Sequence, residues 1–470
     1  MINNLICSNP WMEIQIEYNF NIGCCCYYNG IRPKWNFLET PKFVLQNYWN
    51  NDFFQQLRKI VINNEYFNSG CKNCQELILG FQNTSSDHLT KLNTIQKENY
   101  LKAIYNLKNK KTVIDNLPVR YYFNFGLDCN LNCIMCSQKH LRRQKYHILP
   151  SSIFENLQDY FPYAERITLV GGEPLLIRDC IYFIDKFSKQ KQLEDVTLGL
   201  ITNGTLLDKY LPLLRRIKRL NIAISLDAIE ETYEYIRKGS SWKKVEKNIL
   251  KIKNLIDESK LEWSISINCV VMKSNLKEIN SFFKWIYGNN LKLTIVPVVN
   301  NNLNNAECIF DFPQLLDEIP EWEEIIAESI DILENYDLPS SKRLKILFTK
   351  LKQSYLTYKQ NKNFYPKERI YLNNRELIDY LNQNGKFMIW GTGSFYKNNF
   401  SRFIKTKPSN FLGFIDNNSS LWDSELDGFK VFSPDVLFKL KPNSILIASM
   451  FIKEIKTQIM DMGIDFCKVY

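Results

Sequence analysis

The chain has 470 residues, a formal net charge of +10, 45% hydrophobic residues and 13 cysteines. This length exceeds one ordinary hydrophobic core, so we expect two or three globular domains. No run of about 18 apolar residues is present, and the N-terminus lacks the basic-then-apolar order of a signal peptide. We therefore expect no membrane partner, and the cysteines favour metal clusters in a reducing cytoplasm over disulfides.

The positive charge raises the question of a nucleic-acid partner. The basic residues are spread along the chain, and the short runs 108–111 and 142–145 are not interleaved with stacking aromatic residues. A solvated basic surface explains the charge better, so nucleic acid is not the expected partner.

Residues 1–80 are rich in cysteine, and residues 81–118 read as a helical linker. The cysteine-rich region holds six of the thirteen cysteines, Cys7, Cys24, Cys25, Cys26, Cys71 and Cys74. The last two form a C-x2-C pair. Four thiols with such a pair suit a structural zinc ion as well as an iron–sulfur cluster.

A second cysteine pattern follows directly after the first apolar run of residues 119–300. Cys129, Cys133 and Cys136 have the spacing C-x3-C-x2-C. Soft thiolates select iron–sulfur clusters or zinc. A zinc knuckle would need a fourth ligand nearby, for which His140 is the near candidate.

Short apolar runs and amphipathic stretches alternate throughout residues 119–300. The runs span residues 121–126, 166–170, 196–201, 221–226, 263–271 and 291–298, and the helical patterns span 151–161, 177–190, 205–218, 241–256 and 276–288. Strands that alternate with helices pair in parallel through right-handed crossovers. The second run ends in Gly171-Gly172-Glu173-Pro174, a glycine turn at a strand end.

The remaining chain divides into a bridge and a second α/β unit. Residues 301–375 are polar with helical segments, and residues 376–470 contain three further strands. The first of these runs into Gly391-Thr-Gly393, and the second ends at Asp416, a spacing close to that of a dinucleotide-binding unit. The unit resembles a small Rossmann-like module found beside surface-sugar enzymes, although Tyr396 replaces the third glycine.

The ordered pair of the three-cysteine loop and the Gly-Gly-Glu-Pro turn resembles the radical SAM superfamily over roughly residues 119–300. The resemblance implies a partial (β/α)6 barrel within an α/β chain. It implies a 4Fe–4S cluster held by Cys129, Cys133 and Cys136, with S-adenosylmethionine (SAM) on the open iron. Reductive cleavage of SAM would then produce a 5′-deoxyadenosyl radical that abstracts hydrogen from a substrate.

The same resemblance assigns the SAM pocket to polar residues at the carboxyl ends of the strands. Glu173 with the Gly171–Pro174 turn would hold the amino group of SAM. Asn203 ends the third strand, and Ser225 and Asp227 would face the ribose or the methionine end. Arg237 would pair with the carboxylate, for which a guanidinium is well suited.

The N-terminal cysteines resemble the cluster-binding extension called SPASM, or its shorter twitch form. In that family a cysteine before Pro-Trp, a cysteine pair after a hairpin and a closing C-x2-C bind an auxiliary 4Fe–4S centre. The resemblance implies Cys7, Cys25, Cys71 and Cys74 as ligands, with Cys24 or Cys26 able to replace Cys25.

These patterns predict a radical SAM enzyme acting on a small polar metabolite, such as a sugar derivative, or on a peptide side chain. Flavodoxin or ferredoxin would supply its electron. Two alternatives stay open at this point: a radical enzyme that modifies RNA, and a non-catalytic zinc scaffold.

Overall fold

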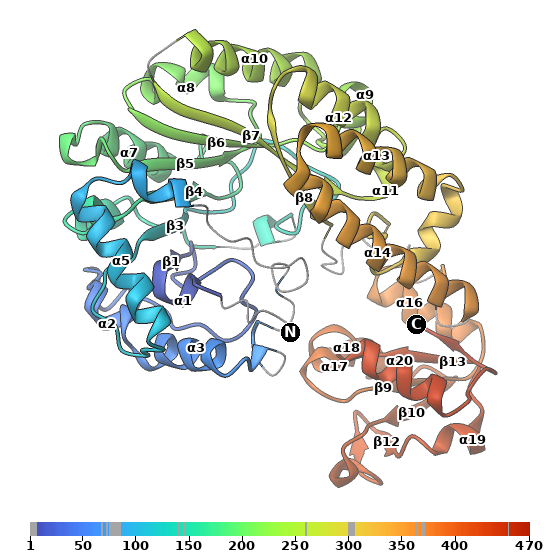
Figure 1. Ribbon diagram of the computed structural model, residues 1–470. Helices are drawn as coiled ribbons and strands as arrows, with labels where there is room; N and C mark the ends of the chain where they lie inside the picture. Colours follow the sequence, from blue (N-terminus) through green and yellow to red (C-terminus); the bar gives the residue numbers. More distant parts are fainter. Residues whose placement is uncertain are drawn as a thin grey trace. The chain divides into compact units, whose positions relative to one another are not determined.

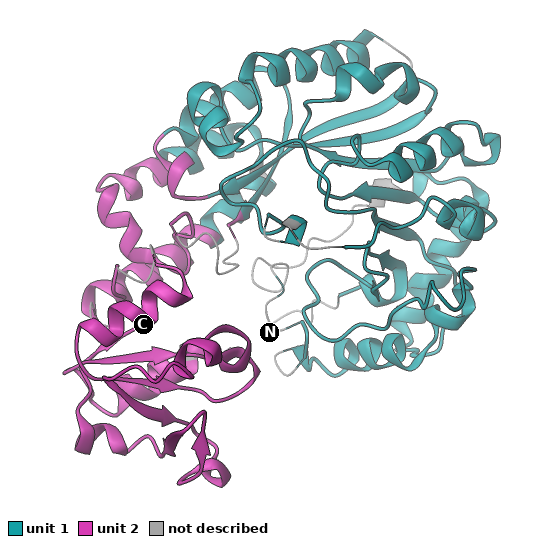
Figure 2. Ribbon diagram, turned by 180° about the vertical axis from the view of Figure 1, so that it is seen from behind, with its two compact units in different colours: residues 1–271, 278–296, 328–346 teal, residues 272–277, 297–327, 347–470 magenta. Residues whose placement is uncertain are grey.

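The computed structural model describes residues 7–66, 69–71, 74, 86–139, 141–143, 146–258, 261–298, 306–361, 365–367, 372–449 and 451–470. Its contacts divide the chain into two compact units (Figure 2). The first comprises residues 1–271, 278–296 and 328–346, and the second comprises residues 272–277, 297–327 and 347–470. Both cysteine patterns lie in the first unit. The domain limits expected from the sequence stay a prediction.

One eight-stranded sheet forms the centre of the first unit (Figure 1). Its strands are β1 (Glu13–Ile16), β2 (Ile22–Gly23), β3 (Arg120–Asn124), β4 (Arg166–Val170), β5 (Thr197–Thr202), β6 (Arg219–Ser225), β7 (Glu262–Val271) and β8 (Lys292–Pro297), in the order β2-β1-β3-β4-β5-β6-β7-β8. Strands β3 to β7 pair in parallel. The α/β fold class expected from the alternating pattern is confirmed.

Helices cover one face of this sheet (Figure 1). They include α5 (Thr94–Lys108), α6 (Ile153–Leu157), α7 (Arg178–Ser188), α8 (Leu207–Leu214), α9 (Glu230–Ile236), α10 (Trp242–Glu258) and α12 (Ile279–Gly288). The sequence pattern located most of them but not α9, which is short. No described helix is both long and apolar enough to cross a membrane.

The N-terminal region joins the sheet, which its sequence did not indicate. After α1 (Asn9–Met12), β1 pairs in parallel with the edge of β3 and forms an antiparallel hairpin with β2. Pairing satisfies the backbone groups that an open edge of β3 would leave unpaired. The cysteine-rich region, which also contains α2 (Leu45–Trp49) and α3 (Asp52–Ile62), is therefore anchored to the barrel sheet.

The two faces of the sheet differ in chemistry because side chains alternate along each strand. On the helix-covered face, one row in register consists of buried apolar residues: Ile16, Phe123, Leu169, Leu200, Ile222 and Ile265. On the opposite face, the adjacent row is polar but uncharged: Gln15, Tyr122, Thr168, Gly199, Asn221 and Ser264. This polar face, which we call the inner face of the sheet, can therefore form hydrogen bonds with a ligand.

Charged residues close the amino ends of the strands on this polar face. Arg120 forms ion pairs with Glu13 at 3.1 Å and with Glu165 at 3.6 Å. Arg219 pairs with Glu262 at 2.9 Å. The charges of these ion-pair partners neutralise each other at the amino ends of the strands, which we call the base of the sheet. These residues therefore stabilise the fold.

Two backbone turns pack directly against each other at the carboxyl ends of β3 and β4. The amide of Gly172 donates to the carbonyl of Gly126 at 2.9 Å, and the amide of Glu173 donates to that of Asp128 at 2.7 Å. A Cβ on Gly172 would lie 2.3 Å from the carbonyl oxygens of both Leu127 and Asp128. Only glycine permits this approach, which places the Gly-Gly-Glu turn against the start of the cysteine loop.

Two long helices, α13 (Trp322–Tyr336) and α14 (Leu338–Gln360), follow the large sheet. The helical segments expected within residues 301–375 are therefore present. Pro339 does not interrupt α14, because it lies in the first turn of this helix, where proline is tolerated.

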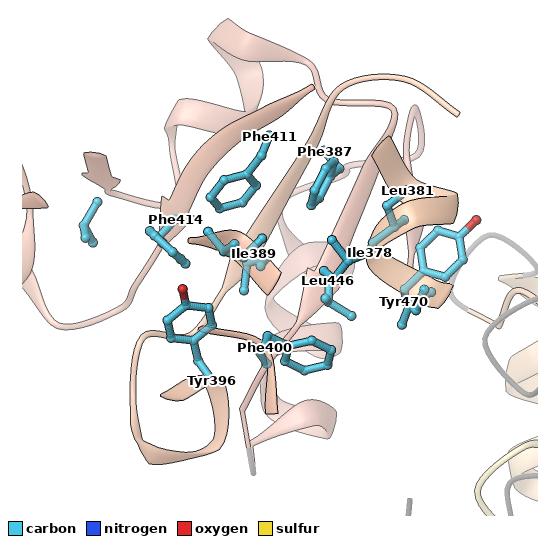
Figure 3. Close-up of a cluster of buried hydrophobic side chains, with 14 residues drawn as sticks. Ile378, Leu381, Phe387, Ile389, Tyr396, Phe400, Phe411, Phe414, Leu446 and Tyr470 are labelled. Carbon is cyan, nitrogen blue, oxygen red and sulfur yellow. The ribbon is translucent and has the colours of Figure 1, made fainter. Parts of the chain in front are cut away.

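A second sheet occupies the C-terminal part of the second unit. Its strands are β9 (Phe387–Trp390), β10 (Phe411–Ile415), β11 (Glu425–Leu426), β12 (Phe429–Phe432), β13 (Ser444–Ile447) and β14 (Lys468–Val469), in the order β11-β12-β10-β9-β13-β14. Its helices are α16 (Asn374–Gln383), α17 (Ser394–Asn399), α18 (Ser401–Ile404), α19 (Val436–Leu440) and α20 (Ile452–Asp461). Aromatic side chains such as Phe387, Phe411 and Phe414 form its core with Tyr396 (Figure 3).

Replacing Gly172 with alanine is expected to lower the free energy of unfolding by about 1–3 kcal/mol, because the overlap with backbone oxygens is relieved only by moving a strand end. Gly288, at the end of α12, is the matched control, since a Cβ there would meet no atom within 4 Å. Denaturant unfolding of the metal-free protein measures both variants. Equal stability of the two alanine variants would contradict the packing described here.

Candidate functional site

The three-cysteine loop follows β3 and is fastened to the segment after α9. The amide of Asn132 donates to the carbonyl of Lys238 at 2.8 Å, and the amide of Ile134 donates to that of Ile236 at 2.9 Å. Cys133 is buried, and Cys129 and Cys136 are partly buried. The loop is thus held on both sides, by the glycine turn after β4 and by residues 236–238.

Hydrogen-bond donors from the chain reach two of the three sulfurs. The amide of Leu131 donates to Cys129 Sγ at 3.5 Å, and Asn203 Nδ2 approaches the same sulfur at 3.8 Å. Arg142 donates to Cys136 Sγ at 3.4 Å and to the carbonyl of Leu131 at 2.9 Å. Such donors stabilise the thiolate form, which is the form that binds metals.

The electrostatic surroundings of the thiols reflect both burial and nearby cations. Burial raises the pKa of the Cys129 thiol, whereas the Leu131 amide and Arg142 act to lower it. Burial also raises the pKa of the Cys133 thiol, and Arg237 opposes that shift. Cations therefore stand close to the sulfurs, where they would balance the negative charge of thiolate ligands.

Glu173 is fully buried, and its carboxylate accepts hydrogen bonds from the chain itself. One oxygen accepts from the Thr202 hydroxyl at 2.7 Å and from the Leu175 amide at 3.1 Å; the other accepts from the Asn203 amide at 2.8 Å. Burial raises the pKa of the carboxyl, while the Asn203 amide and the Thr202 hydroxyl counteract the shift. Its visible role is to tie the end of β5 to the glycine turn, which Pro174, also buried, continues.

Asp227 and Arg237 form a buried ion pair rather than two separate contacts to a ligand. Arg237 Nη2 lies 2.7 Å from Asp227 Oδ2, and the Val270 amide donates to Asp227 Oδ1 at 2.9 Å. Burial acts to lower the pKa of Arg237, but the charges of Asp227 and Cys133 more than offset it and raise the pKa. The pair is thus a charged support behind the cysteine loop.

Ser225 and Asn268 extend the uncharged polar face to the carboxyl edge of the sheet. They are register partners at the ends of β6 and β7, and both are half-buried. Asn203 directly follows β5, and its side chain bonds Asn130 and Thr205. Neutral amides and hydroxyls therefore surround the edge at which the cysteine loop lies.

Five of the N-terminal cysteines come together in space. The thiol of Cys7 interacts electrostatically with Cys25, Cys71 and Cys74. Cys24 is hydrogen-bonded to Cys25 and interacts with Cys7 and Cys71. The four residues expected as ligands thus form one group, with Cys24 beside them. Cys26 interacts instead with Glu13 and Arg32, besides its neighbour Cys25.

The candidate zinc ligand and the donor geometry bear on the kind of metal. His140 lies outside the described residues. Within the described part of the chain, no three His, Cys, Asp or Glu side chains converge closely enough to bind one ion. Within each of the two cysteine groups the thiols lie near one another, but the described residues do not form a site for a single metal ion.

In the second unit, Thr392 of the glycine turn is hydrogen-bonded to Asp416, which follows β10. Asp416 Oδ2 accepts from the Thr392 amide at 3.0 Å and from its hydroxyl at 2.6 Å. Gly391 has a φ of +108°, and a Cβ there would lie 2.8 Å from the carbonyl oxygen of Ala448. Close packing on β13 explains this glycine without a ligand, and Gly393 makes no comparable approach. Nucleotide binding by Gly391, Gly393 and Asp416 stays a prediction.

The sequence alone did not single out the polar side chains that link the loops of the site. Asn130 bonds both Asn203 and Thr205, and Arg142 bonds Cys136. Asn130 could have been noticed by its position between two cysteines. Arg142 gave no signal, because it lies in a basic run that reads as solvated.

Two parts of the chain match known families. Residues 123–286 match the radical SAM superfamily, and residues 383–470 match the family described as C2185-like, N-terminal.

The curated relatives described below match over half of the chain or less. A GTP 3′,8-cyclase of Peptoclostridium acidaminophilum is 26% identical over 251 residues, which cover 50% of this chain and 74% of the relative. Molybdenum cofactor biosynthesis protein 1 of Dictyostelium discoideum is 30% identical over 38% of this chain and 29% of its own length. A GTP 3′,8-cyclase of Campylobacter lari is 30% identical over 31% of this chain and 44% of its own.

Two solved structures are similar to parts of this chain at low TM-scores. Streptococcus suis SuiB bound to S-adenosylmethionine has a TM-score of 0.34 and 14% identity, covering 67% of this chain and 69% of SuiB. The structure titled native anSMEcpe with bound AdoMet and Cp18Cys peptide has a TM-score of 0.31 and 21% identity, covering 38% of this chain and 51% of its own.

The matched residues 123–286 contain the three-cysteine loop, the glycine turn after β4 and the strands that carry the polar edge. Residues 123–286 are thus a radical SAM domain, and the chain that contains it is an enzyme of the radical SAM class.

Proposed function

We propose that this enzyme binds a 4Fe–4S cluster through Cys129, Cys133 and Cys136 and cleaves SAM reductively to abstract hydrogen from a substrate. The observation that carries the proposal is the packing of the cysteine loop against the Gly171–Glu173 turn. The donor chemistry fits, because three thiols on one loop leave one iron of a four-iron cluster without a protein ligand.

The chain's own residues would hold and orient the group. Asn203 and the Leu131 amide donate to Cys129, and Arg142 donates to Cys136, so thiolate charge at these sulfurs is stabilised. Glu173 fixes the end of β5 relative to the glycine turn. When bound, the cluster supplies the electron that splits SAM, and the protein's task is to position the partners and exclude water.

Arg237 and Asp227 would act together in this arrangement. The Nε of Arg237 is buried and has no hydrogen-bond partner among the described residues. One edge of the guanidinium is held by Asp227, so this remaining donor is available to an acceptor beside Cys133. The carboxylate of SAM is an acceptor of the right charge.

The substrate we propose is a polar molecule whose part within the barrel is uncharged. The row Gln15, Tyr122, Thr168, Gly199, Asn221 and Ser264 and the edge residues Ser225 and Asn268 offer amides and hydroxyls. A sugar-like metabolite or a peptide segment meets this face with hydrogen bonds. An electron donor of the flavodoxin or ferredoxin type would complete the reaction.

We also propose that the N-terminal cysteines hold an auxiliary 4Fe–4S cluster, with Cys7, Cys25, Cys71 and Cys74 as ligands. The support is the grouping of these four thiols around Cys7. Their region is joined to the barrel sheet through β1, so the second centre would lie in the same compact unit as the first.

Replacing Cys129, Cys133 and Cys136 with alanine should abolish 5′-deoxyadenosine formation and leave the second cluster. After anaerobic reconstitution, iron content should fall from about eight to about four atoms per chain, since each cubane contributes four irons. A Cys180→Ala variant, changed at a buried cysteine outside both groups, is the control. Undiminished deoxyadenosine formation by the triple variant would refute the assignment.

Asp227→Asn should destabilise the metal-free protein by about 3–5 kcal/mol, because the buried Arg237 loses its counter-charge. Glu328→Gln removes an exposed pair with Lys284 and should cost under about 1 kcal/mol. Thermal or denaturant unfolding compares the two. A small effect of Asp227→Asn would show that the pair does not support the loop as described.

Substrate class can be tested by the stimulation of 5′-deoxyadenosine formation in the presence of dithionite. Uncharged probes, namely a neutral glycoside and a blocked neutral peptide, are expected to stimulate more than GTP does. The uncharged row of the inner face offers no cation to a triphosphate, and Arg120 and Arg219 at the amino ends of the strands are already paired with carboxylates. GTP is included because relatives carry the name GTP 3′,8-cyclase. Stimulation by GTP alone would overturn the uncharged-substrate proposal.

A further inference from the structure

Arg58, on α3 of the cysteine-rich region, is a buried cation without a carboxylate partner. It has no exposed surface. Among the described residues, the buried arginines are Arg58 and Arg237; Arg237 keeps 6% of its surface exposed and is paired with Asp227. No carboxylate of the described chain lies within ion-pair distance of Arg58. An isolated buried charge is costly, so its retention needs a reason.

The hydrogen bonds of Arg58 all go to neutral oxygens. Nε donates to the Pro10 carbonyl at 2.9 Å, and Nη2 donates to the Trp49 carbonyl at 2.8 Å. Nη1 donates to the Thr112 carbonyl at 2.7 Å and to Asn50 Oδ1 at 3.0 Å. These bonds use four of the five N–H donors of the guanidinium and leave its positive charge uncompensated.

The thiols are the nearby groups that can become negative. Burial lowers the pKa of Arg58 to about 9, and the charge interaction that opposes this shift is with Cys24. Cys24 in turn interacts with Cys25, Cys7 and Cys71. Arg58 also holds Pro10, three residues after Cys7, and the guanidinium lies 5.2 Å from the ring centre of Trp49. The cation is therefore fixed by a hydrogen bond to the segment that follows Cys7, and Cys24 is the thiol with which its charge interacts.

We propose that Arg58 is the buried counter-charge of an anionic iron–sulfur centre held by the N-terminal cysteines, and that it raises the reduction potential of this centre. The inference rests on the auxiliary cluster proposed above. A cluster bound by thiolates carries net negative charge, and reduction by one electron adds another. A fixed cation in a low-dielectric site stabilises the reduced form more than the oxidised form.

The experiment isolates the N-terminal centre in the background Cys129→Ala, Cys133→Ala, Cys136→Ala. This protein is reconstituted anaerobically with iron and sulfide and analysed for both elements. The potential of the remaining cluster is then measured by redox titration followed by electron paramagnetic resonance. In the same background, Arg58→Met removes the charge, Arg58→Lys keeps it but loses the planar fork, and Arg219→Met removes a charge whose partners are Asp195 and Glu262.

A counter-charge role predicts a lower potential for Arg58→Met and a potential near that of the background protein for Arg58→Lys and Arg219→Met. If Arg58→Met folds but does not retain the cluster while Arg58→Lys does, the role is supported as well. A purely structural clamp predicts similar losses of thermal stability in both Arg58 variants and no charge-dependent shift. Unchanged potential in Arg58→Met would overturn the inference while leaving the auxiliary cluster in place.

Failure of the underlying proposal looks different. Zinc without sulfide, or no metal, in the background protein would remove the auxiliary iron–sulfur centre, and Arg58 would lose the role assigned here. The radical SAM activity of the protein with all cysteines intact is independent of that outcome.

Discussion

The contact between two backbone turns determines the arrangement of the whole site. The Gly171–Glu173 turn after β4 donates amide hydrogen bonds to carbonyls at the start of the cysteine loop after β3. The approach leaves no room for a Cβ on Gly172, so no residue with a side chain can take the place of this glycine. The relative position of the three thiols and the carboxyl ends of the strands follows from this contact, and the polar network of Asn130, Asn203 and Thr205 extends it to β5.

Charged and uncharged polar residues of the first unit lie in different parts of the sheet and its loops. At the base of the sheet, arginines and carboxylates neutralise each other and close the amino ends of the strands. The next row is uncharged and can still form hydrogen bonds. Near the thiols, Arg142, Arg237 and Arg58 supply positive charge. This order places neutral polar groups where a substrate would lie and cations where thiolates would bind metal.

The N-terminal region and the barrel form a single sheet, which has a functional consequence. Strand β1 pairs with β2 on one side and with β3 on the other. The two cysteine groups therefore belong to one compact unit. The two clusters proposed above would therefore be held within the same compact unit. In the second unit, by contrast, the glycine turn and Asp416 satisfy each other, and the parallel sheet is stabilised by its aromatic core.

Local patterns in the sequence determined the strands of the barrel, the parallel fold class and the two cysteine groups, because alternation, spacing and glycine turns are local signals. Only the tertiary structure decided how the polar residues are used. Glu173 is occupied by β5, and Asp227 and Arg237 are occupied by each other. Within the described residues Arg58 bonds only neutral oxygens, and β1 completes the edge of β3. These outcomes depend on which distant groups become neighbours when charges are buried, and a linear pattern of residue types does not contain that information.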